Sequence, residues 1–205
     1  MDCLIVFEDA PSEAILTRLV TEYAPTLSIT ARFAARGFGN IKSGFPRFRN
    51  ASNAVPHIVL TDLDQYPCAS ALLRDWNALP LHRRVFFRIA VREIESWLLA
   101  DSVGIASMLS IDRKKIPTAP DDVANPKQTL VNLSRRSKSR RFSAEFAPAT
   151  SSSAQIGPMY NDYLCRFIRA NWNVENARAR SPSLQRCILR LQDFAVTATQ
   201  MDNSH

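Results

Sequence analysis

Two short apolar runs that end in carboxylates constrain this chain more than any other feature. Cys3–Phe7 is followed by Glu8, and His57–Thr61 is followed by Asp62 and Asp64. Short apolar runs bounded by polar turn residues are typical of buried strands. Neighbouring parallel strands lie about 4.8 Å apart, and ligands bind beyond their carboxyl ends. If the two strands are neighbours, the three acidic side chains meet at one point.

Three carboxylates at one point repel each other unless a cation holds them. Oxygen ligands without histidine or cysteine suit Mg²⁺ or Mn²⁺. We therefore predict a metal site in which Glu8, Asp62 and Asp64 are both metal ligands and catalytic residues. The four cysteines and three histidines share no metal-ligand spacing, so we expect no zinc site.

Strand-like and helix-like patterns alternate through the first half of the chain. The predicted strands are Leu4–Phe7, Leu27–Phe33, Ile58–Thr61 and Val85–Ala90, and the predicted helices are Pro11–Tyr23, part of Ile41–Asn53, Cys68–Leu79 and Val91–Leu109. This alternation indicates an α/β fold with a mainly parallel sheet flanked by helices on both faces.

We expect three regions along the chain. Residues 1–111 form the α/β catalytic core, and residues 112–153 form a basic, proline-containing, loop-rich segment with one short helix at Lys127–Leu133. Residues 154–205 form a helical C-terminal extension packed on the core, with helices at Tyr160–Trp172 and Ser183–Ala195. Ser181-Pro182 is a plausible helix cap followed by a first-turn proline.

The charge favours an anionic partner. The net charge is +7, and residues 112–141 hold nine basic and three acidic residues, which gives +6 in this piece. Nucleic acid is the simplest partner for such a chain, and a merely soluble basic protein is the alternative. No apolar run approaches the roughly 20 residues of a membrane helix, and no basic region or cleavage site precedes the first strand. We therefore expect a cytoplasmic protein that does not enter the membrane.

Two basic segments are candidates for contact with nucleic acid. The first mixes glycine, aromatic and basic residues, which suits backbone tracking and base stacking. The second is a basic run that either neutralises phosphates or is a solvated loop. The predicted contact residues are Arg36, Lys42, Arg47, Arg49, Lys127, Arg135, Arg136, Arg140 and Arg141.

The acidic residues resemble those of the Toprim domain of topoisomerases, bacterial primases, OLD-type nucleases and small maturation ribonucleases. That superfamily has a glutamate after its first strand, usually followed by glycine, and an Asp-x-Asp after a later strand. The counterparts here are Glu8, Asp62 and Asp64, and Asp9 stands in place of the glycine. The resemblance implies a Toprim-like, Rossmann-like sheet and phosphodiester chemistry that depends on Mg²⁺ or Mn²⁺.

The rest of the chain is similar to a narrower group, the small stand-alone bacterial Toprim-like proteins of unassigned function. The matching pieces are Arg88-Ile-Ala-Val-Arg-Glu-Ile-Glu-Ser-Trp-Leu-Leu-Ala-Asp101, Asn125-Pro-Lys127 and Ser181-Pro-Ser-Leu-Gln-Arg186. Proteins of this type are often encoded beside an ATPase in defence-like cassettes. The resemblance therefore implies an ATPase partner and a role in antiviral defence.

The Arg-Glu-x-Glu piece has two interpretations. In the first, Glu95 is a further catalytic residue that adds or orients a metal ligand, with support from Arg92, Glu93 and Asp9. In the second, Glu95 and Arg92 form a surface ion pair on an amphipathic helix. With the resemblance we favour the first, and we expect Trp97 to lie in the core.

These observations predict a metal-dependent nuclease that acts on DNA or RNA. One alternative is a non-catalytic Toprim-like binding or regulatory subunit, which Asp9 in the glycine position favours. A second alternative is a phosphatase, because Asp62-Leu-Asp64 resembles the Asp-x-Asp of haloacid-dehalogenase-type enzymes. There the motif usually follows the first strand and continues with Thr or Val, whereas here Gln65 follows.

Overall fold

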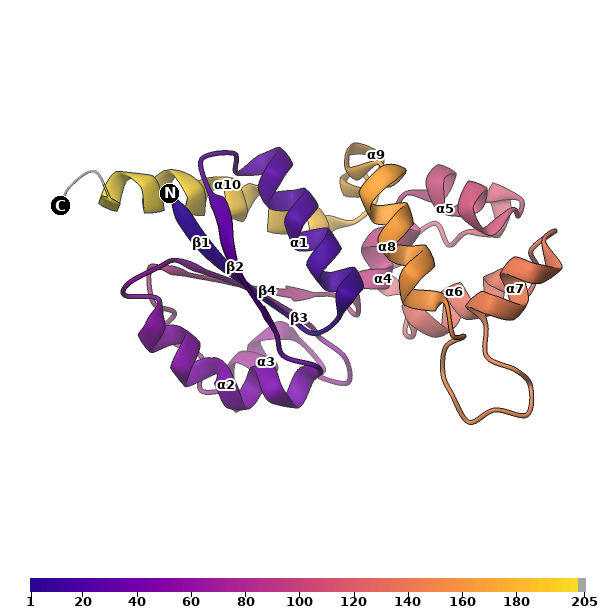
Figure 1. Ribbon diagram of the computed structural model, residues 1–205, viewed down its shortest axis with the longest axis horizontal. Coiled ribbons are helices and arrows are strands. Elements are labelled where there is room, and N and C mark those ends of the chain that lie inside the picture. The colour runs from indigo at the N-terminus through magenta and orange to yellow at the C-terminus, as the bar shows by residue number, and fades with distance from the viewer. Residues whose placement is uncertain (203–205) are drawn as a thin grey trace. The chain divides into compact units, whose positions relative to one another are not determined.

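The computed structural model describes residues 1–202 of the chain, with side chains to residue 200. Within these residues four parallel strands form one sheet in the order β2-β1-β3-β4, and helices flank it (Figure 1). The strands are β1 (Asp2–Phe7), β2 (Ser28–Ala34), β3 (His57–Asp62) and β4 (Val85–Ala90). The predicted α/β class is confirmed, and the arrangement is a doubly wound, Rossmann-like one.

The two central strands are apolar because both of their faces are covered. Val6 of β1 pairs with Val59 of β3, and both side chains are fully buried, as are those of Ile5 and Ile58. Buried β-branched residues in an uninterrupted run are typical of a parallel sheet with helices on both faces. Edge strand β2 is mostly exposed instead.

The chain divides into two compact units. The first contains residues 1–90 and the chain from Arg186 onward, and the second contains Val91–Gln185. The boundary predicted at residue 111 is therefore wrong, because the predicted helix after β4 belongs to the second unit. The predicted C-terminal extension is also divided, since residues 154–185 belong to the second unit.

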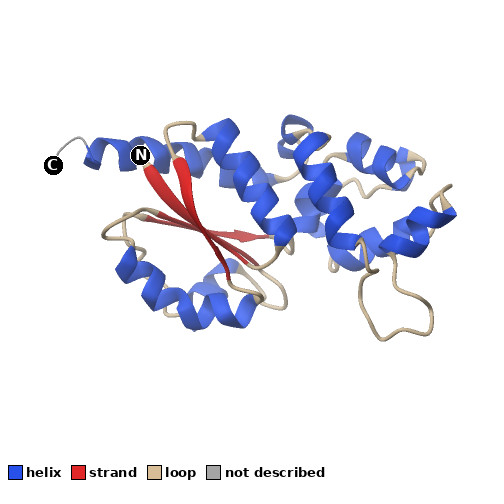
Figure 2. Cartoon of the chain, viewed as in Figure 1, coloured by secondary structure: helices blue, strands red, loops and turns tan. Residues whose placement is uncertain are grey.

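Helices cover both faces of the sheet in the first unit. These are α1 (Ala10–Tyr23), α2 (Phe38–Ala51), α3 (Ala69–Asp75) and the distal part of α10 (Pro182–Asp202). Figure 1 shows α1 and α10 on one face and α2 and α3 on the other, and Figure 2 shows the sheet between these helices. Ring contacts join helices to strand β4: Phe45 of α2 lies 4.8 Å from Phe87, and Phe194 of α10 lies 5.4 Å from Phe86.

The second unit is helical. Its elements are α4 (Ile94–Ala100), α5 (Ser102–Leu109), η1 (Arg113–Lys115), η2 (Pro120–Asp122), α6 (Pro126–Ser134), α7 (Arg140–Phe146), α8 (Tyr160–Ala170) and α9 (Val174–Arg178). The predicted single helix Val91–Leu109 is wrong, because the chain breaks at Asp101. The buried Asp101 carboxylate caps α5 by accepting the Gly104 N–H at 3.1 Å and also accepts the Asn173 N–H at 2.9 Å.

The start of α10 confirms the predicted cap. The Ser181 hydroxyl oxygen accepts the Leu184 N–H at 3.1 Å and donates to the Asp121 carboxylate at 2.6 Å. Trp97 is fully buried, and its indole N–H donates to the Ser183 hydroxyl at 2.6 Å. The predicted core position of Trp97 is therefore confirmed, and two of the matching sequence pieces contact each other inside the second unit.

No helix within residues 1–202 combines the length and the apolar character that crossing a membrane requires.

Candidate functional site

The sheet has a topological switch point between β1 and β3. From β1 the chain crosses to β2 on one side, and from β2 it returns past β1 to β3 on the other side. In such sheets, the two connections leave in opposite directions and open a crevice outside the carboxyl ends of the central strands. The residues that follow β1 and end β3 line this position.

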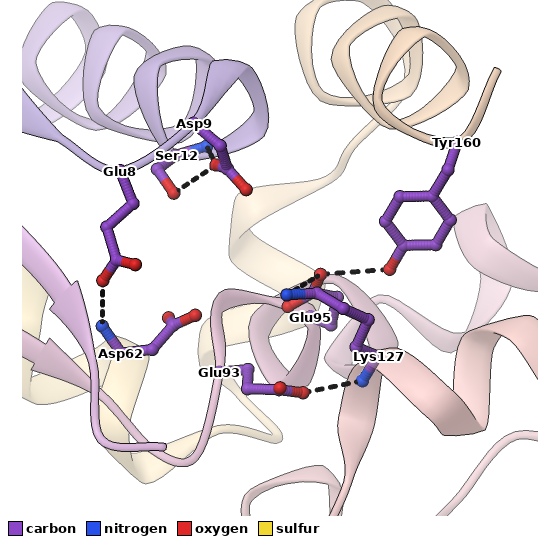
Figure 3. A network of polar contacts seen from close by, with 8 residues as sticks. All are labelled: Glu8, Asp9, Ser12, Asp62, Glu93, Glu95, Lys127 and Tyr160. Atoms are coloured by element: carbon purple, nitrogen blue, oxygen red, sulfur yellow. Dashed lines mark hydrogen bonds and ion pairs between the residues drawn. The ribbon is translucent and has the colours of Figure 1, made fainter. Parts of the chain in front are cut away.

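Glu8 follows β1, and Asp62 ends β3. One carboxylate oxygen of Glu8, Oε1, accepts a hydrogen bond from the Thr61 hydroxyl at 2.7 Å. The same oxygen accepts the Asp62 backbone N–H at 3.2 Å (Figure 3). Thr61 is 1% exposed and Glu8 is half-buried, so the first of these bonds is partly buried. The structure thus brings together two of the three predicted metal ligands, and it ties the Glu8 carboxylate to the end of the neighbouring strand.

Asp9 has a structural role that the sequence did not reveal. It is the N-cap of α1, and its Oδ1 accepts the Ser12 N–H at 2.9 Å and the Ser12 hydroxyl at 2.6 Å (Figure 3). A carboxylate at this position satisfies a helix donor and complements the positive end of the helix dipole. The acid at position 9 is therefore explained as a helix cap.

Asp64 does not extend the strand pattern. Leu63 is buried, and its N–H donates to the Ala90 carbonyl at 2.9 Å. Asp64 is exposed and lies in a turn with a left-handed φ of 49°. No group of three or more His, Cys, Asp or Glu residues able to hold a metal ion exists among the described residues. The predicted three-carboxylate cluster is not formed, because the chain turns out of the strand after Asp62.

The chemistry of Glu8 and Asp62 still suits a hard divalent cation. Mg²⁺ usually keeps several waters and is bound through one or two carboxylates together with substrate phosphates. Glu8 and Asp62 supply two carboxylates from adjacent strands, with no competing thiolate or imidazole in the predicted ligand set. These residues fit a magnesium or manganese ion that completes its shell with water and substrate.

The second unit contains a separate polar cluster around Glu95. Glu95 is 1% exposed and accepts a hydrogen bond from the buried Tyr160 hydroxyl at 3.0 Å (Figure 3). The Lys127 ammonium lies 3.6 Å from the same oxygen, and the Lys127 N–H donates to Glu93 at 2.8 Å. The interpretation of Glu95 as half of a surface ion pair is wrong, because its side chain is buried. Its predicted catalytic role stays a prediction, as do the supporting roles of Arg92 and Glu93.

Lys42 is already paired inside the first unit. Its ammonium lies 2.6 Å from the exposed Asp75 carboxylate, which also accepts the Tyr66 hydroxyl. The hydrogen bond with Asp75 raises the pKa of Lys42, and the same bond lowers the pKa of Asp75. Of the other predicted contacts on this segment, Arg36 and Arg47 are exposed and Arg49 is half-buried.

The predicted basic run is less irregular than expected. Arg135 follows the end of α6, and Arg140 and Arg141 open α7, so the solvated-loop interpretation is only partly right. Arg135 donates to the Pro148 carbonyl at 2.9 Å, and Arg141 pairs with Glu145 at 2.8 Å. Arg136 and Arg140 are exposed.

Two polar residues of these clusters, Thr61 and Tyr160, were not predicted from the sequence. Thr61 precedes Asp62 in a buried strand, and a polar residue in such a run is a usable signal. Tyr160 is distant from Glu95 in sequence, so only the fold reveals their contact.

Comparisons with protein-family models, curated proteins and solved structures gave no match to this chain.

Proposed function

We propose that this chain is a nuclease that depends on Mg²⁺ or Mn²⁺ and hydrolyses phosphodiester bonds in DNA or RNA. The observation that supports it most is the hydrogen bond from the Asp62 backbone N–H to the Glu8 carboxylate, which places both acidic residues at the topological switch point of the sheet. Open parallel sheets bind ligands at this position. The resemblance to Toprim domains supports the same residues independently of the fold.

The residues would divide the work in the following way. Glu8 and Asp62 would hold the cation, which when bound polarises the scissile phosphate and activates water. Thr61 fixes the Glu8 carboxylate through its hydroxyl, so that Glu8 presents its other oxygen in a defined direction. Exposed basic residues such as Arg36 and Arg47 would hold the nucleic-acid backbone.

A second candidate is the non-catalytic binding subunit. The lack of a three-acid group among residues 1–202 favours it, because a site with fewer ligands binds a cation more weakly. No observation favours the phosphatase alternative. Asp64, the second aspartate of its motif, lies in an exposed turn after the strand. An ATPase partner and a role in antiviral defence also belong to this proposal and rest on the resemblance alone.

A cleavage assay with matched variants tests the proposal. Purified protein is incubated with plasmid, single-stranded DNA and RNA in the presence of Mg²⁺, Mn²⁺ or EDTA. We expect cleavage that EDTA abolishes and that Asp62→Asn reduces roughly 100-fold or more, because the amide keeps the shape and loses the charge. Asp193→Asn removes an exposed carboxylate of the same unit and should leave cleavage unchanged.

The opposite result is equally clear. Wild-type protein that binds nucleic acid but cleaves nothing under every metal condition, with a neighbouring ATPase supplied, would overturn the nuclease and favour the binding subunit.

A further inference from the structure

Two basic turns of the second unit lie against each other. The first is Ser110–Lys115, which leads from α5 through η1, and the second is Arg135–Arg140, which joins α6 to α7. The Lys138 N–H donates to the Ser110 carbonyl at 3.3 Å, so the two turns are in direct contact. The sequence places these charges far apart, and only the fold joins them.

The cations on these turns are not neutralised. Five of them are exposed and form no ion pair with any carboxylate in the part of the chain that the structure describes: Lys114, Lys115, Arg136, Lys138 and Arg140. The one acid of the first turn, Asp112, is exposed and its carboxylate accepts the Lys114 N–H at 2.9 Å.

Two arginines on helices of the same unit are, in contrast, paired with carboxylates. Arg166 pairs with Asp162 at 2.8 Å, and Arg178 pairs with Glu175 at 3.2 Å. These two helical arginines are therefore balanced by acids of their own helices, whereas the five cations where the two turns meet are not. Like charges held together on a surface raise the local positive potential, which attracts a polyanion.

The surroundings favour nucleic acid over a lipid surface. Membrane-surface binding requires large apolar side chains that enter the interface. The large hydrophobic residues that border the two turns, Ile116 and Phe142, are 5% and 9% exposed, and Ile111 within the first turn is half-buried. A polar surface on which cations outnumber acids, here with Asp112 as the acid of the first turn, is typical of contact with a phosphate backbone.

We propose that the two turns form one surface, the two-turn surface, that binds the phosphate backbone of nucleic acid. This inference deepens the proposed function and rests on it for the identity of the anion. It adds Lys114, Lys115 and Lys138 to the predicted contacts, and it treats Arg136 and Arg140 as members of a composite site. Binding here is electrostatic and independent of base sequence, because no aromatic platform accompanies the charges in either turn.

Salt-dependent binding tests the surface. The affinity for a labelled DNA duplex and for a single strand is measured by fluorescence anisotropy in EDTA, so that binding is seen without cleavage. The variants are Lys114→Ala/Lys115→Ala on the first turn and Arg136→Ala/Lys138→Ala on the second. The control is Arg166→Ala/Arg190→Ala, which removes the same charge from exposed helical positions.

Each phosphate contact contributes about 0.9 to the slope of log affinity against log salt on duplex DNA. Each turn variant should therefore lower the slope by about 1.8. Between about 50 and 200 mM salt, its affinity should fall roughly tenfold less than that of wild type. The control should keep the wild-type slope, and circular dichroism should show all three variants folded.

Several results would overturn the inference. If the control changes the slope as much as the turn variants do, net charge alone explains the binding. If only the second-turn variant differs from wild type, the composite surface is wrong. Binding to vesicles of anionic lipid without binding to nucleic acid would assign the surface to a membrane. If wild type cleaves and binds DNA and both turn variants have the salt slope of wild type, the two-turn surface is wrong and the proposed nuclease activity is unaffected. Wild type that binds no nucleic acid would refute both.

Discussion

Replacing Thr61 by valine should loosen the Glu8 carboxylate without changing the shape of the core. Thr61 is 1% exposed and donates to Glu8 Oε1 at 2.7 Å. Valine has nearly the same volume and is favoured in strands. The substitution therefore removes the hydroxyl donor and leaves Glu8 with the Asp62 N–H as its remaining partner in this pair of bonds.

The magnitude follows from two opposing effects. A hydrogen bond to a charged group contributes about 1.5–3 kcal/mol to the free energy of unfolding. Burying an additional apolar carbon in place of the hydroxyl returns about 0.8 kcal/mol. Thr61→Val should therefore lower the free energy of unfolding by about 1–2 kcal/mol, or the melting temperature by about 2–8 °C for a chain of this size.

Urea unfolding followed by circular dichroism, with Thr61→Ser as the matched control, measures this effect. Serine keeps the hydroxyl and loses a methyl group, so it isolates the packing term. The cost of Thr61→Val should not be recovered by adding Mn²⁺, because the Glu8 carboxylate is no longer fixed. If Thr61→Val is as stable as wild type, the hydrogen bond to Glu8 does not hold the site together, and the reasoning is refuted.

Three further predictions concern buried groups. Glu95→Gln keeps an acceptor for the Tyr160 hydroxyl but loses the charge opposite Lys127. In urea unfolding it should lower the free energy of unfolding by about 1–2 kcal/mol, against about 3 kcal/mol or more for Glu95→Ala. A loss of cleavage larger than the loss of folded protein would support a catalytic Glu95. Burial lowers the pKa of His57 below its ordinary value of 6.5, so the unfolded chain binds the proton more readily than the folded one. The free energy of unfolding should therefore fall as the pH decreases below 6.5. If His57→Asn has the same dependence of stability on pH as wild type, this prediction is wrong. Burial raises the pKa of the Cys187 thiol to about 12, whereas Cys68 is exposed. A thiol reagent should therefore label Cys68 alone in the native protein. Labelling of Cys187 before unfolding would contradict the packing of α10.

The strands were predictable because their signal is local. Val85–Ala90 was predicted with the bounds it has in the structure. Glu8, which follows β1, and Asp62, which ends β3, were correctly placed at the same edge of the sheet. A short uninterrupted apolar run bounded by turn residues is typical of a buried strand. The parallel order follows from alternation with helices.

The second unit was less predictable because its elements depend on distant contacts. The break after α4 requires the Asp101 carboxylate to accept N–H groups from Gly104 and from Asn173, and the second of these is remote in sequence. The short helices α7 and α9 were missed for a similar reason, since helices of this length are stabilised by packing more than by propensity.

The site shows the same division. Glu8 and Asp62 follow from strand ends, whereas the turn that carries Asp64 outward depends on Leu63 packing into the core and pairing with Ala90. Burial of Glu95 depends on Tyr160, which lies on a later helix. The prediction that Asp64 joins Glu8 and Asp62 at one point failed because the strand ends at Asp62 and the chain then turns away.

Manganese binding tests the central claim most directly, because it needs no knowledge of the substrate. Free Mn²⁺ is followed by electron paramagnetic resonance during titration into wild type, Glu8→Gln, Asp62→Asn, Asp64→Asn and the control Asp75→Asn. We predict that wild type, Asp64→Asn and Asp75→Asn bind Mn²⁺ and that Glu8→Gln and Asp62→Asn lose this binding. The Glu8 carboxylate accepts the Asp62 N–H at the switch point, whereas Asp64 lies in an exposed turn. Wild type that binds no Mn²⁺, or equal binding by wild type and Asp62→Asn, would contradict the account.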